Sequence, residues 1–159
     1  LLCGEGYMPR PLLEGGTGSL SRLQEMPDFL PDRLEAGTHN VHGAVGLLEG
    51  LRFVRRLGPG QAARHEIALL SALADRLRRT GRYRVFDGGG TVLSVIPLDT
   101  SPEELADTLA QRGVAVRAGL HCAPLAHITA GTVQTGTMRF SMSVFNTMEE
   151  VEQVAEMLS

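Results

Sequence analysis

Residues 137–158, TMRFSMSVFNTMEEVEQVAEML, join a strand pattern to a helix pattern. Apolar Met138, Phe140 and Met142 alternate with other residues over 137–143, which is typical of a strand with one buried face. Thr147 followed three residues later by Glu150 forms a capping box, which predicts a helix that continues through Leu158. The chain therefore ends in a strand followed by an amphipathic helix.

The same alternation of strands and helices precedes this pair. Two strands are predicted at 83–86 and 91–96, joined by a glycine turn at 87–90. Ser101, Pro102 and Glu104 give a strong helix start, and that helix ends at Gly113. A short strand at 114–117 and a loop at 118–136 complete the series. The order predicts an α+β fold with a small, mostly antiparallel sheet packed by helices.

Two helices and an irregular segment come before the first strand. Asn40 caps a predicted helix at 41–57, and Gly58-Pro59-Gly60 separates it from a second helix at about 61–79. Residues 1–36 are rich in glycine and proline, which rules out a long helix there. We expect this segment to lie against another domain, and we interpret Leu1 as a cut end.

Composition restricts the class of protein. The 159 residues carry a formal net charge of −3 and no basic stripe, which argues against nucleic-acid binding. No apolar run has the length of a membrane span, and no signal peptide is recognisable, so a cytoplasmic location is expected. Cys3 and Cys122, far apart, do not suggest a disulfide framework. All 15 basic residues are arginine, so the chain has no side-chain amine that could form a Schiff base.

Two residues in the second half are candidates for chemistry. Cys122 follows a strand end and lies close in sequence to His121 and Arg117; positive neighbours favour a reactive thiolate, although an inert buried thiol is the commoner role. Arg139 stands within an apolar strand, where a guanidinium must be paired or directed at an anion such as a carboxylate. A solvent-facing arginine on an edge strand or a structural salt bridge is an equally good interpretation of Arg139.

The first half holds a candidate anion site. The turn 35–40 places Thr38 before a helix N-terminus, where hydroxyl and amide groups can bind an anion, although a plain capping turn also explains it. The glycine loop 15–19 lacks the ending of a P-loop, so a nucleoside triphosphate site is rejected. His39 with His42, and Cys122 with a nearby histidine, do not supply the ligands of a structural metal site, and no metal is expected.

Four separated stretches, at 15–19, 31–40, 117–127 and 136–147, resemble the cysteine desulfurases and selenocysteine lyases of the class V aminotransferase fold, which use pyridoxal 5'-phosphate (PLP). The order and spacing of the four agree with that family, and the resemblance covers essentially the whole chain. It implies residues 1–40 as the end of the large PLP domain, 41–80 as connecting helices and 81–159 as the small C-terminal domain.

The resemblance also implies roles for individual residues. Cys122 is similar to the cysteine that takes sulfur from the substrate as a persulfide, and Arg139 to the arginine that holds the substrate carboxylate. His121 is expected to bind the substrate as well. Thr38, with Gly37, is similar to the residues that contact the cofactor phosphate of the partner subunit in a homodimer. His39 departs from the family pattern, since many relatives carry proline there.

The function implied is that of the C-terminal part of a PLP-dependent cysteine desulfurase that converts L-cysteine to alanine, with a sulfur acceptor protein as a further partner. The family's PLP-binding lysine lies upstream of residue 15, so the isolated chain is expected to be inactive and to bind no PLP covalently. The alternatives are a selenocysteine lyase or another class V enzyme, a non-catalytic binding module, and a thiol sulfur carrier that works without PLP.

Overall fold

The computed structural model describes residues 4–20, 22–58 and 60–159. The chain divides into two compact units, Leu1–Val54 and Arg55–Ser159. The domain boundaries expected at residues 40 and 80 stay a prediction.

The first unit has little regular structure before its helix. Among its described residues, the only helical turn before α1 (Val41–Leu57) is η1 (Asp32–Leu34), as the prolines and glycines predict. The Asn40 side chain accepts a hydrogen bond from the Gly43 amide at 2.9 Å, which confirms the predicted cap. The glycine loop is tied to the turn before α1, because the Gly37 amide donates to the Gly16 carbonyl at 2.8 Å.

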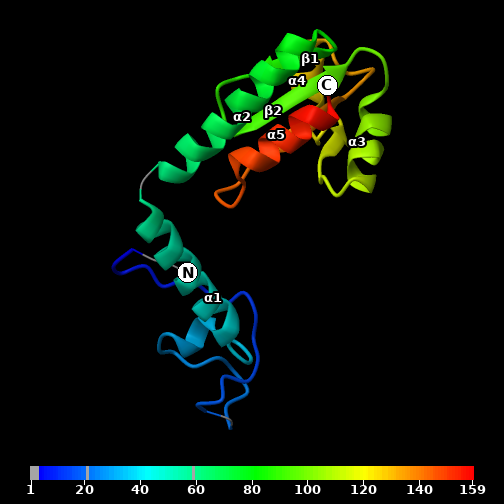
Figure 1. Ribbon diagram of the computed structural model, residues 1–159. Coiled ribbons are helices and arrows are strands. Elements are labelled where there is room, and N and C mark those ends of the chain that lie inside the picture. Colours follow the sequence, from blue (N-terminus) through cyan, green and yellow to red (C-terminus); the bar gives the residue numbers. More distant parts are fainter. Residues whose placement is uncertain (1–3, 21, 59) are drawn as a thin grey trace. The chain divides into compact units, whose positions relative to one another are not determined.

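A four-stranded antiparallel sheet forms the second unit. Its strands are β1 (Tyr83–Asp87), β2 (Val92–Pro97), β3 (Arg117–Gly119) and β4 (Thr137–Ser141), in the order β1-β2-β4-β3. Its helices are α2 (Gln61–Thr80), α3 (Pro102–Gln111), α4 (Pro124–Ala130) and α5 (Met148–Met157). This architecture confirms the predicted α+β fold with an antiparallel sheet (Figure 1).

The hydrophobic core lies on one face of the sheet. Alternation in β2 and β4 places Leu93, Val95, Met138 and Phe140 on that face, each at most 4% exposed. Helices α2, α3 and α5 cover them, and α2 packs alongside α5 (Figure 1). The remaining core side chains come from these helices and the residue after α5: Leu69, Leu70, Leu73, Ala74, Leu77, Leu109, Val151, Ala155 and Leu158.

Both predicted capping boxes are present. Ser101 and Glu104 exchange side-chain and backbone hydrogen bonds at the start of α3, and Thr147 and Glu150 do the same at the start of α5. Each cap satisfies amide groups that a helix start leaves unpaired, which stabilises the fold by about 1 kcal/mol.

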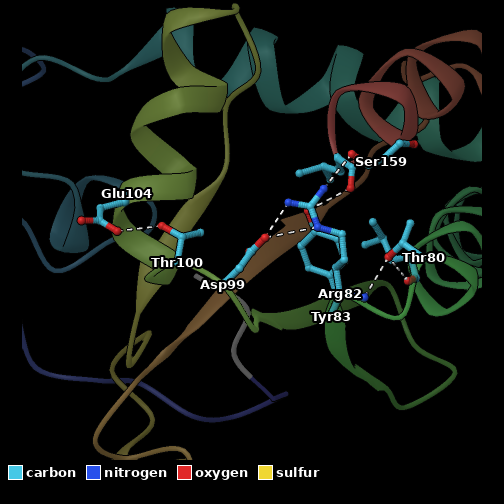
Figure 2. A network of polar contacts seen from close by, with 9 residues as sticks. Thr80, Arg82, Tyr83, Asp99, Thr100, Glu104 and Ser159 are labelled. Atoms are coloured by element: carbon cyan, nitrogen blue, oxygen red, sulfur yellow. Dashed lines mark hydrogen bonds and ion pairs between the residues drawn. The ribbon is translucent and has the colours of Figure 1, made fainter.

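Arg82 fastens the end of the chain to the sheet. Its guanidinium donates to the Asp99 carboxylate, and Nη1 donates to the Ser159 carbonyl at 2.8 Å (Figure 2). The hydroxyl of neighbouring Tyr83 donates to the Leu158 carbonyl at 3.0 Å. These contacts join the end of α5 to the start of β1 and the loop after β2.

Two sequence predictions in this unit were wrong. The strand expected at 114–117 is displaced to Arg117–Gly119, because the Val114 amide still caps α3 by donating to the Leu109 carbonyl at 2.9 Å. The segment expected to be a loop, 118–136, contains α4. Pro124 in its first turn and Gly131 at its C-cap, with φ 66°, are ordinary helix boundaries that delimit this short helix.

Candidate active site

The sheet face opposite the core carries a polar row. In β4, Arg139 projects away from the core residues Met138 and Phe140 and lies opposite Ser94 of β2 and Arg117 of β3. Two cations directly opposite each other in neighbouring strands repel. The charge of this row therefore favours a bound anion.

Arg139 occupies an interior strand of the sheet. Strand β4 lies between β2 and β3, so the interpretation of Arg139 as an edge-strand residue is wrong. Among the described residues, no carboxylate forms an ion pair with Arg139, and its Nε is buried without a hydrogen-bond partner. An unpaired buried donor is costly, and a ligand that accepts from it removes that cost.

The loop after β3 presents Cys122. His121 and Cys122 both have positive φ angles, 52° and 60°. Non-glycine residues rarely adopt this conformation, and two in succession hold about 1–3 kcal/mol of backbone strain each, which is common at functional sites. Cys122 is exposed, and the following amide of Ala123 returns to the Leu120 carbonyl at 2.9 Å. A tight turn thus holds the thiol in solvent.

Two glycines fix where this turn starts. Gly119, with φ 106°, ends β3, and Gly136 precedes β4. A Cβ on Gly136 would lie 2.9 Å from the Gly119 Cα, so only glycine allows the two backbones to approach this closely. Neither glycine was singled out from the sequence, because their contact depends on the pairing of β3 with β4.

His121 is half-buried beside β4. Its Nε2 lies 3.1 Å from the Thr137 carbonyl and 3.2 Å from the Thr137 hydroxyl. Burial lowers the pKa of His121; the bond to Thr137 opposes this shift, whereas the charges of Arg139, His127 and Arg117 add to it. His121 is therefore neutral at neutral pH.

Helix α4 covers part of the same face through His127. This residue is 6% exposed, its Nδ1 lies 2.7 Å from the Thr132 hydroxyl, and its ring centroid is 5.9 Å from that of His121. A cavity of about 160 Å³ separates α4 from the sheet. It is lined by Phe86, Ser94, Ala126, His127, Ala130, Thr132 and Thr137. Thr132 and Thr137 were not candidates in the sequence, because Thr132 stands in no recognisable motif and Thr137, although within the stretch 136–147, was given no role there.

The first unit holds the other candidate residues. Gly37 and Thr38 line a surface hollow of about 550 Å³ together with the glycine loop 16–18. Gly37 has a φ of 86°, a conformation suited to glycine. His39 also lines this hollow, and its Nε2 lies 3.2 Å from a carboxylate oxygen of Glu35. Cys3 lies outside the described residues. Within the described chain, no three histidine, cysteine or acidic side chains cluster as metal ligands would.

Comparison with known proteins identifies the family. The Aminotransferase class-V family matches residues 6–154. The chain belongs to this family. The resemblance inferred from the four sequence stretches is thereby confirmed.

The chain is also similar to individual class V proteins. It is 37% identical over 165 residues to a probable cysteine desulfurase of Xylella fastidiosa (strain Temecula1 / ATCC 700964), covering 87% of the chain and 39% of that protein. It is 39% identical over 125 residues to a probable cysteine desulfurase of Mycolicibacterium paratuberculosis (strain ATCC BAA-968 / K-10), covering 77% of the chain and 18% of that protein. The chain thus spans about two fifths or less of the length of these curated relatives.

Solved structures agree on the fold. A cysteine desulfurase from Thermococcus onnurineus NA1 superposes with a TM-score of 0.74 at 30% identity, covering 94% of the chain and 38% of that structure. Cysteine desulfurase CsdA from Escherichia coli superposes with a TM-score of 0.73 at 27% identity, covering 92% of the chain and 37% of that structure.

None of the described helices combines the length and apolarity that crossing a bilayer requires.

Proposed function

We propose that this chain supplies the sulfur-accepting part of a PLP-dependent cysteine desulfurase, which converts L-cysteine to alanine and leaves a persulfide on Cys122. One observation carries the proposal: the exposed thiol of Cys122 is held in a strained turn on the loop that follows β3. Strand β3 is hydrogen-bonded to β4, which carries Arg139 with its buried Nε unsatisfied. The names of the relatives support the same chemistry.

Arg139 binds the substrate carboxylate in this proposal. Its buried, unpartnered Nε and the opposing charge of Arg117 both favour an anion on this face of the sheet. A guanidinium can hold a carboxylate through two parallel hydrogen bonds, which fixes the orientation of the substrate as well as its position. His121, on the loop that carries Cys122, completes the substrate side of the site.

The residues of the first unit fit one part of the cofactor. The hollow at 16–18 and 37–38 is lined by two threonines, Thr17 and Thr38, and by glycines, a composition that suits a phosphate group. In the proposal, Thr38 and Gly37 contact the cofactor phosphate of the partner subunit in a homodimer. PLP, when bound, supplies an electron sink that weakens the carbon–sulfur bond of the substrate. The 159 residues contain no lysine, so its covalent attachment requires a residue outside them.

Cys122 performs the sulfur transfer. Its thiolate attacks the substrate sulfur, a sulfur–sulfur bond forms and the carbon–sulfur bond breaks. The electron pair of the broken bond stays with the substrate carbon, which takes up a proton to give alanine. The persulfide at the exposed position of Cys122 is then available to an acceptor protein. The proposed enzyme works in the cytoplasm.

The test uses the longest reading frame that contains this chain. With PLP and L-cysteine, the protein should release alanine and carry a persulfide on Cys122, mapped by mass spectrometry after alkylation. Cys122→Ser should abolish the persulfide, whereas the control Cys3→Ser should leave it. Arg139→Lys should raise the cysteine concentration needed by more than tenfold, because an ammonium cannot reproduce the two-pronged contact. A persulfide that persists in Cys122→Ser would refute the assignment.

A PLP-independent sulfur carrier is the second candidate. The exposure of Cys122 favours a sulfur carrier, because a carrier needs an accessible thiol. A carrier that works without PLP also does not require a lysine, and the chain has none. The 159-residue chain mixed with an inorganic polysulfide, without PLP, should then gain sulfur at Cys122. Release of alanine from cysteine by the longer protein decides for the desulfurase, and faster release from selenocysteine decides for a selenocysteine lyase.

A further inference from the structure

Two buried polar atoms near the Cys122 loop have no hydrogen-bond partner in the described chain. They are Nε of Arg139 and Nδ1 of His121. Buried side-chain polar atoms are rarely left unpaired in folded proteins, and each exception calls for an explanation such as a ligand. Nε of Arg139 carries a hydrogen and can only donate a hydrogen bond.

The hydrogen bonds of His121 define the role of its other nitrogen. Nε2 lies 3.1 Å from the Thr137 carbonyl oxygen, which can only accept, so Nε2 carries the ring proton. Because His121 is neutral, Nδ1 then holds a lone pair and acts as an acceptor. The neighbouring His127 is engaged differently, since its Nδ1 is paired with the Thr132 hydroxyl at 2.7 Å.

The two unpaired atoms lie on the same side of the sheet. Thr137, which holds His121, and Arg139 project from the same face of β4, two residues apart, so their Cα atoms are roughly 7 Å from each other. The positive charge of Arg139 acts on His121 and contributes to its lowered pKa. Because Thr137 binds His121 and lies only two residues from Arg139 on the same strand face, a single ligand that contacts both groups must be short.

We propose that His121 Nδ1 and Arg139 form one subsite for a short acid with a hydrogen-bond donor on its third carbon. Arg139 holds the carboxylate, and His121 accepts from the donor, which is a thiol in the substrate. The subsite rests on the proposed function in one respect: the thiol end is assigned to His121 because Cys122, next in sequence, must reach the substrate sulfur. His121 thus selects acids that carry a thiol or hydroxyl over the bare acid.

The first test measures the tautomer of His121 in the unmodified 159-residue chain. Long-range proton–nitrogen NMR spectra at pH 7 should show a neutral His121 with its proton on Nε2. A proton on Nδ1 would overturn the proposal, because the nitrogen would then be a donor. This measurement requires no variant and no ligand.

The second test compares three acids by NMR titration under reducing conditions: propionate, 3-hydroxypropionate and 3-mercaptopropionate. The hydroxy acid should bind about fivefold more tightly than propionate, the factor that one ordinary neutral hydrogen bond supplies. The mercapto acid should bind about two- to threefold more tightly, since a thiol is a weaker donor. Both should shift the Nδ1 resonance of His121, and propionate should not.

Variants separate the two halves of the subsite. His121→Phe should bind all three acids with the same affinity while keeping the propionate affinity of the unmodified chain, because a phenylalanine side chain has no hydrogen-bond acceptor. Arg139→Gln should lose at least tenfold in affinity for all three. Equal affinities in the unmodified chain, or no binding of any acid, would overturn the proposal. Equal affinities would leave the proposed function standing, since the persulfide on Cys122 is scored separately, whereas no binding of any acid would also remove the carboxylate role proposed for Arg139.

Discussion

Replacement of Gly136 by alanine tests the close contact that places the Cys122 loop beside β4. The added Cβ would meet backbone atoms of Gly119 at 2.9, 3.0 and 3.1 Å, which cannot be relieved by rotating a side chain. The residue also has a φ of 63°, which costs an alanine about 1–2 kcal/mol. Overpacking against the backbone adds about 1–3 kcal/mol. We expect a loss of about 2–5 kcal/mol in the free energy of unfolding.

Gly131→Ala is the matched control. Gly131 has nearly the same φ, 66°, but a Cβ there would meet nothing within 4 Å. The Gly131→Ala variant should therefore lose only the part of the unfolding free energy that comes from the positive φ angle, about 1–2 kcal/mol. Urea unfolding followed by circular dichroism measures both variants, and the difference between them isolates the contact. Equal losses would refute the argument that the approach of the two backbones fixes this loop.

The remaining predictions concern the thiols, histidine, cofactor and N-terminal segment. Iodoacetamide at neutral pH should label Cys122 faster than Cys3, and equal labelling would remove the nucleophile assignment. The pKa of His121 is lower in the folded chain than the ordinary value of 6.5, so the unfolded chain binds that proton first as the pH falls. Stability should therefore decrease from about pH 6.5 down to the folded pKa and then level off; His121→Gln should flatten this decrease, and an unchanged slope would contradict the reasoning. Borohydride reduction of the isolated chain with PLP should give no adduct except at the N-terminal amine, since lysine is absent; a mass-mapped side-chain adduct would be inconsistent with this. Residues 4–36 should exchange amide hydrogens rapidly or bring about self-association, because Leu12 and Leu13 are 95% and 73% exposed; slow exchange in a monomer would argue otherwise.

Local signals predicted most of the fold. The caps at Asn40, Ser101 and Thr147 located the starts of three helices, because side-chain capping depends on residues within one turn. The alternation of apolar residues gave β4 and the face that it buries. Helix α4 was missed because seven residues are too few for a periodic apolar stripe, and its one buried residue is His127.

The candidate site could be predicted only in part. Cys122 and Arg139 were candidates in the sequence because a cysteine close to a histidine and an arginine, and an arginine in an apolar strand, are unusual. The family resemblance gave each its role, and those roles stay predictions. The opposition of Arg139 to Arg117 depends on strand register, and the unpaired state of His121 Nδ1 depends on the position of Thr137. Neither can be derived from local sequence, since each involves pairing between distant segments.

The alternation of residues along β4 has a consequence for how mutations in this strand are detected. Met138 and Phe140 belong to the core, so replacing them should lower the amount of folded protein in a cell. Arg139, between them, faces the candidate site, so its replacement by a neutral residue of similar size should leave abundance nearly unchanged and remove activity. A survey of all substitutions in the strand, scored once for abundance and once for activity, should therefore show two complementary patterns with a period of two residues.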